Sequence, residues 1–104
     1  MDAYRQGLDQ QLRQMREHAH AAFENPNDPR ASAIHNALRQ AEEANQMGRG
    51  LRDVHNSLQT AQRLMRQAHN LPHDQQVMNQ THLMDFDHRI EHMNMGIRSH
   101  PHFQ

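Results

Sequence analysis

The sequence predicts an all-α protein, a four-helix bundle with up-down-up-down order. Apolar residues recur every three or four positions in four separate segments, which is the spacing of amphipathic helices. Clusters of Pro, Gly and Asn separate these segments and are typical of turns. No segment alternates apolar and polar residues with period two, and none is enriched in β-branched residues, so we expect no strands.

The first helix is expected over about residues 2–24. Its apolar stripe consists of Tyr4, Leu8, Leu12, Met15, Ala19, Ala22 and Phe23. A turn follows at residues 25–29, where the sequence is Asn-Pro-Asn-Asp-Pro. Asp28 is a good N-cap and Pro29 a good first-turn residue, so this turn is expected to start the next helix.

Two further helices are expected over residues 29–47 and 51–70, joined by the Gly-Arg-Gly turn at residues 48–50. The apolar residues of the second helix are Ala31, Ile34, Leu38 and Ala41. Those of the third are Leu51, Val54, Leu58, Ala61, Met65 and Ala68. The segment 34–38 (Ile-His-Asn-Ala-Leu) recurs at 54–58 as Val-His-Asn-Ser-Leu. This short repeat indicates that the two helices bury similar faces in one antiparallel hairpin.

The fourth helix is expected over residues 73–96, with its stripe continuing a little further along the chain. The stripe consists of Leu83, Phe86, Ile90, Met93 and Ile97. Residues 1–99 are interpreted as a single domain and residues 100–104 as a frayed tail containing two histidines. Hydrophobic residues make up only 35% of the chain, so the core is thin. We therefore expect self-association to complete the bundle, with the fourth helix mediating it.

The composition excludes several classes of function. Eleven basic residues stand against 12 acidic ones, for a formal net charge of -1, so we expect no nucleic-acid binding. No apolar run is long enough to cross a membrane, and residues 1–14 do not resemble a secretory signal. The chain has no cysteine, glycine-rich phosphate loop or nucleophile motif, so a non-enzymatic protein is expected.

The chain is also rich in histidine and methionine and free of lysine. It contains 11 His, 8 Met and 13 Gln, and all 11 basic residues are Arg. A GC-rich genome, an engineered or recoded sequence, and selection against lysine modification each account for the missing lysine. Composition alone leaves these three explanations open.

The fourth helix carries a candidate metal site. At 100° per residue, His88 and His92 share a face roughly opposite the apolar stripe, at the i and i+4 spacing that lets two imidazoles reach one ion. On the same face, Asp85 offers an oxygen ligand, and Met84 and Met95 offer thioethers suited to Cu(I). The ion expected is Zn, Cu or Ni. Two histidines are an incomplete site, so a partner helix or second protomer is expected to complete it.

Two other histidine patterns have different interpretations. Glu17 with His20, and Asp85 with His88, have the spacing of the Glu-x-x-His motif of di-iron bundles, whose ligands project inward. Here Glu17 and Asp85 point away from their helices' apolar stripes, which argues against a buried di-metal centre. His55 lies beside a core position, and in the expected hairpin it would lie across from Glu42 or Glu43.

Together these features predict a non-enzymatic interaction or scaffold protein, natural or engineered. It would self-associate or dock a partner helix along its exposed Met and His face. The alternative is a transition-metal-binding protein that uses the surface His and Met residues, with the site at a protomer interface. A third interpretation is pH sensing, because eleven histidines can add positive charge near pH 6.5 and loosen the bundle.

Overall fold

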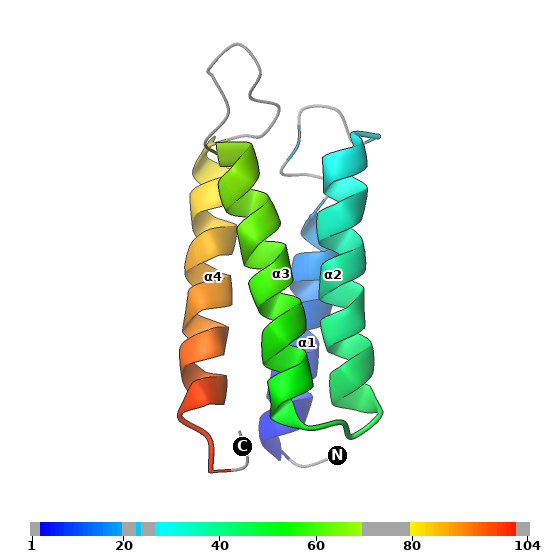
Figure 1. Ribbon diagram of the computed structural model, residues 1–104, viewed down its shortest axis with the longest axis vertical. Coiled ribbons are helices and arrows are strands. Elements are labelled where there is room, and N and C mark those ends of the chain that lie inside the picture. Colours follow the sequence, from blue (N-terminus) through cyan, green and yellow to red (C-terminus); the bar gives the residue numbers. More distant parts are fainter. Residues whose placement is uncertain (1–2, 20–22, 24–26, 70–79, 102–104) are drawn as a thin grey trace.

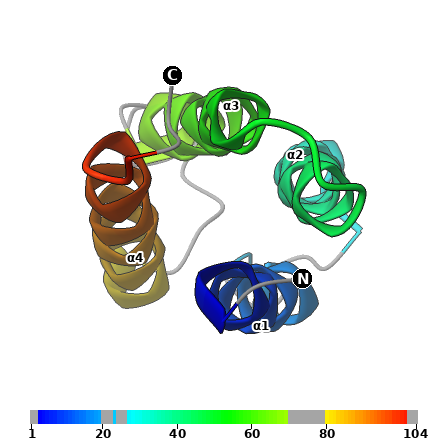
Figure 2. The ribbon, with the colours of Figure 1, turned by 90° about the horizontal axis from the view of Figure 1, so that it is seen from below.

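The chain forms an all-α structure, as its sequence predicts (Figure 1). The computed structural model describes residues 3–19, 23, 27–69 and 80–101, and these residues form four helices and no strand. The helices are α1 (Ala3–His18), α2 (Pro29–Gln46), α3 (Leu51–His69) and α4 (Gln80–Arg98). They lie side by side in a bundle that measures 44 × 21 × 17 Å, and Figure 2 shows them around a common interior.

The prediction for the end of the first helix is wrong, because α1 ends at His18 and does not continue to residue 24. The Ala19 N–H donates to the carbonyl of Arg16 at 3.3 Å, three residues back, which tightens the last turn. The Nδ1 atom of His18 lies 2.7 Å from the carbonyl oxygen of Gln14 and can cap it. Phe23 is nevertheless buried, so it reaches the core from outside the helix.

Both ends of α2 lie close to the predicted positions, for local chemical reasons. Asp28 is the N-cap, and its carboxylate accepts a hydrogen bond from the Arg30 N–H at 2.8 Å. At the other end, Gly48 has φ +73°, a left-handed conformation that favours glycine. The N–H of Arg49 then donates to the carbonyl of Ala44 at 3.0 Å, which closes a Schellman-type helix end.

The fourth helix extends to Arg98, slightly beyond the predicted end at residue 96. Its predicted start at residue 73 lies outside the described residues. Just after α4, the ring of His100 lies against that of Tyr4 in α1, with their centroids 4.6 Å apart. The first residues after α4 therefore pack on α1, while residues 102–104 of the predicted tail lie outside the described part.

The predicted stripes form the core. The described stripe residues from Leu8 onwards are buried, and they pack into one cluster to which all four helices contribute. The largest fully buried side chains are Leu12, Met15, Ile34, Leu38, Leu51, Leu58, Met65, Ile90 and Ile97. The side chain of Leu83, which the sequence also assigns to the core, lies outside the described residues. Polar side chains enter the interior as well, notably Asn45 and Asn94.

Polar contacts fix how α3 and α4 lie against each other. The carboxylate of Asp87 lies 3.2 Å from the Arg66 guanidinium, and Gln62 donates to Glu91 at 3.0 Å. Nearer the other end of α3, Arg98 lies 3.4 Å from the ring of His55. Along these contacts the residue numbers rise in α4 from 87 to 98 while those of their partners in α3 fall from 66 to 55. The two helices are therefore antiparallel.

The two polar residues expected to face each other across α2 and α3 turn in different directions. His55 lies against Arg98 of α4. Glu42 instead faces α1, where its carboxylate accepts a hydrogen bond from the Arg16 guanidinium at 2.6 Å. Each side chain finds its charged or polar partner on the neighbouring helix outside the hairpin.

Candidate functional site on the outer side of α4

The bundle is most open between its first and last helices. Close backbone packing joins α1 to α2, α2 to α3 and α3 to α4, whereas α1 and α4 approach less closely. A hollow of about 510 Å³ lies between them. Its lining residues are Gln11, Gln14, Met15, Asp85, His88, Arg89, His92 and Met93. A second hollow of about 270 Å³ shares Gln11, His92 and Met93. The two neighbouring hollows are here named together the α1–α4 groove.

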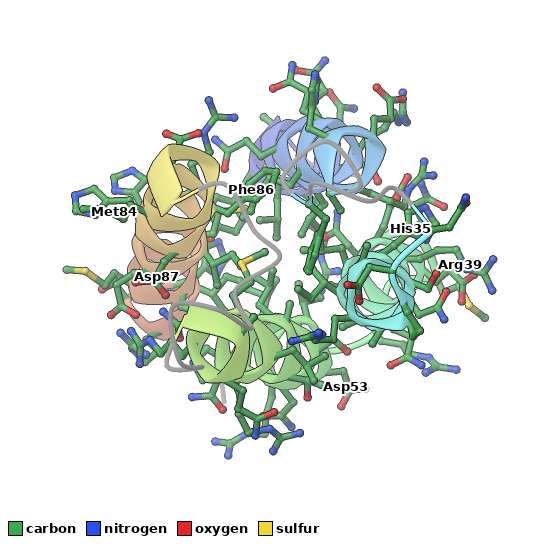
Figure 3. All side chains as sticks on the ribbon, turned by 90° about the horizontal axis from the view of Figure 1, so that it is seen from above. His35, Arg39, Asp53, Met84, Phe86 and Asp87 are labelled. Atoms are coloured by element: carbon green, nitrogen blue, oxygen red, sulfur yellow. The ribbon has the colours of Figure 1, made fainter. Side chains whose placement is uncertain are left out.

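The structure brings three of the five predicted metal-site residues to this groove. Asp85, His88 and His92 line it from α4. Met84 and Met95 lie outside it and are 64% and 55% exposed. Figure 3 shows Met84 pointing away from the bundle. All five residues are exposed, but only three of them line the groove.

We name the exposed strip formed by Met84, His88, His92 and Met95 the α4 outer face. Met84 and Met95 are eleven residues apart, which places them only about 20° apart around the helix axis. They belong with Met47 to the large hydrophobic side chains that are more than half exposed. The α4 outer face thus combines two exposed thioethers with two exposed imidazoles.

Asp85 has another partner. Its carboxylate lies 3.1 Å from the Arg89 guanidinium, one helical turn along α4. This ion pair competes with any role for Asp85 as a metal ligand. Within the described residues, no three side chains of His, Cys, Asp or Glu gather closely enough to hold a metal ion. A metal site built from these four residue types in this part of a single chain therefore has at most two ligands.

The described residues also give no support to a buried di-metal centre. Glu17, Asp85 and His88 are all exposed, as the direction of their helix faces predicts. His20, the other histidine of the two Glu-x-x-His-like patterns, lies outside the described residues.

The histidines differ in whether they have partners. The ring of His18 lies against the Gln14 carbonyl, that of His55 against Arg98 and that of His100 against Tyr4, and His35 also makes a polar or ring contact. His88 and His92 make no hydrogen bond, ion pair or ring contact with the rest of the described chain. Their nitrogens are available to an external ligand.

His55 has a structural environment that favours its neutral form. Burial lowers the pKa of its imidazole, and the nearby Arg98 guanidinium lowers it further. A hydrogen bond with the Asn56 side chain opposes this shift. Close by, the hydrogen bond from Gln62, together with Arg98, lowers the pKa of Glu91. These groups form a polar seam between α3 and α4.

Sequence reasoning missed the α1 side of the groove. Gln11 and Gln14 lie there as polar residues flanking the apolar stripe of α1. Met15 and Met93, expected only as core residues, also line the groove while remaining nearly buried. Little in the sequence indicates this groove, because it exists only where the first and last helices become neighbours and leave space between them.

Comparisons with known proteins give no relative for this chain. No family model, curated protein or solved structure matches it. Among the described helices, none has the length and apolar character needed to span a membrane.

Proposed function

We propose that this chain is a non-enzymatic interaction module, an up-down-up-down bundle that self-associates through the α4 outer face. The observation that carries the proposal is the exposure of Met84 and Met95, at 64% and 55%, on one strip of α4. Methionine is flexible and polarizable, and exposed methionines are common on adaptable binding surfaces.

A second copy of the chain is the partner that this face fits. Along the axis of α4, the midpoint between Met84 and Met95 lies only half a residue, or about 0.75 Å, from the midpoint between the two histidines. If two α4 helices pack antiparallel about this point, Met84 of each lies level with Met95 of the other. His88 of each likewise lies level with His92 of the other. A twofold contact uses the same surface on both copies, and this pattern satisfies that requirement.

A concentration series in the presence of a chelator tests self-association. We expect light scattering coupled to gel filtration to show a mass that rises from one chain towards two. Met84→Ser and Met95→Ser should each shift the transition to higher concentration, because they remove apolar contact. Met47→Ser is the matched control, since Met47 is 69% exposed at the end of α2. A variant pattern in which only Met47→Ser weakens the dimer would contradict the assignment to α4.

The α1–α4 groove favours a second candidate function, docking a helix of another protein. The larger of its two hollows, of about 510 Å³, has a mixed lining of Gln, Met and His that suits one face of an amphipathic helix. Helical peptides selected against the bundle from a display library test this. We expect Gln11→Trp, which fills the groove, to abolish their binding. Peptides that bind the variant as well as the parent would exclude the groove.

A further inference from the structure

The proposed dimer has a small apolar contact. Each copy contributes two exposed methionines, which is few beside the roughly 20–30 residues a side of a standard stable interface. A further contact at its centre would hold the two copies together at lower concentration. At its centre the antiparallel arrangement brings together the two imidazoles of one copy and the two of the other.

We infer that His88 and His92 from two copies bind one Zn²⁺ ion at the centre of this contact. The inference rests on the proposed self-association, since each chain supplies only half of the ligands. His88 and His92 stand one helical turn apart, where side chains are about 5–6 Å apart at Cβ and two imidazoles can reach one ion. Four ligands in a tetrahedron are the usual arrangement of a closed zinc site.

Three features of the structure support a site shared between copies. Neither imidazole has a hydrogen-bond, ion-pair or ring partner within the described residues, so binding breaks no such contact there. Within the same part of the chain, no third His, Cys, Asp or Glu side chain completes the ligand set. The nearest carboxylate on the same side of α4, that of Asp85, is already paired with Arg89 at 3.1 Å.

The methionines have a separate role in this arrangement. Met84 and Met95 lie beyond the histidines on either side, towards the two ends of α4. In the antiparallel pair they flank the ion with apolar side chains and limit the access of water. An imidazole set favours Zn²⁺ and its neighbours in the first transition row over Mg²⁺ or Ca²⁺, which prefer oxygen ligands.

Zinc titration of the full chain tests the inference. At a chain concentration low enough that the chain is monomeric in EDTA, we expect calorimetry to give one Zn²⁺ per two chains. Light scattering should show the mass doubling, and EDTA should reverse both effects. His88→Ala and His92→Ala should each abolish the zinc-dependent doubling, while circular dichroism confirms that these exposed substitutions leave the helices intact. His18→Ala is the control, because His18 is exposed on another helix and should leave the effect unchanged.

The outcomes separate this inference from the proposed function. One Zn²⁺ per chain with no change in mass overturns the shared site, as does mass doubling that survives His88→Ala. Self-association in EDTA that zinc leaves unchanged overturns the zinc site and supports the proposed function. A chain that stays monomeric at every concentration, with and without zinc, overturns both.

Discussion

Replacing each of two buried asparagines with Leu is expected to change the stability of the bundle in opposite directions. Asn94 is 0% exposed, and neither its amide nitrogen nor its oxygen has a hydrogen-bond partner in the described structure. Asn45 is 1% exposed, but its amide nitrogen donates to the Arg5 carbonyl at 2.8 Å and its oxygen accepts from the Arg5 guanidinium at 3.3 Å. Replacing Asn94 with Leu therefore removes a polar group that has no partner, whereas replacing Asn45 with Leu removes one that is hydrogen-bonded.

We expect Asn94→Leu to stabilise the fold. A buried polar group without a partner costs about 1–3 kcal/mol, and Leu keeps the branching at Cγ while replacing both polar atoms with methyl groups. The expected gain in the free energy of unfolding is about 1–3 kcal/mol, and each kcal/mol raises Tm by roughly 4–8 °C in a domain of this size. Asn45→Leu should lose a similar amount, because the Arg5 groups are left without their partner.

Urea denaturation followed by circular dichroism measures both free energies, and a thermal melt gives both Tm values. The two variants should shift in opposite directions. If Asn94→Leu is less stable than the parent, the polar atoms of Asn94 are satisfied in the folded protein. If Asn45→Leu is more stable than the parent, the hydrogen bonds with Arg5 do not stabilise the fold.

Three further predictions concern the turn after α2, the buried carboxylate of Glu42 and the imidazole of His55. Gly48→Ala should lose about 1 kcal/mol in urea denaturation because Gly48 has φ +73°, whereas Gly50→Ala, which lacks a positive φ, should change little. Glu42→Ala should lose about 1–3 kcal/mol because its carboxylate is buried and bonded to a guanidinium at 2.6 Å. Glu43→Ala removes an exposed pair and should lose less than about 0.5 kcal/mol, so equal losses would refute the distinction. Because the folded state lowers the pKa of His55, stability should be full above pH 6.5 and fall as the pH drops through the folded pKa. His55→Gln should reduce that fall in a series of melts from pH 8 to pH 5, and an unchanged profile would exclude His55 as its source.

Much of the candidate site was visible in the sequence because it depends on one helix. His88 and His92 share a face of α4 through their spacing alone, and the stripe of Phe86 and Ile90 fixes which face is buried. The exposure of Met84 follows from the same periodicity. Spacing does not show which side chains already have a partner. Asp85, for example, could make several contacts on its helix face, and the structure pairs it with Arg89.

The sequence by itself determined the all-α class, the apolar faces and the two ends of α2, because periodicity, the Asp28 cap and the glycine of the following turn act over a few residues. Tertiary structure decided where α1 ends, since Phe23 enters the core from beyond the helix. It also turned His55 towards α4 and left the α1–α4 groove open. These features depend on which helices, distant in the sequence, pack against each other. The spacing of residues within one segment does not determine that packing.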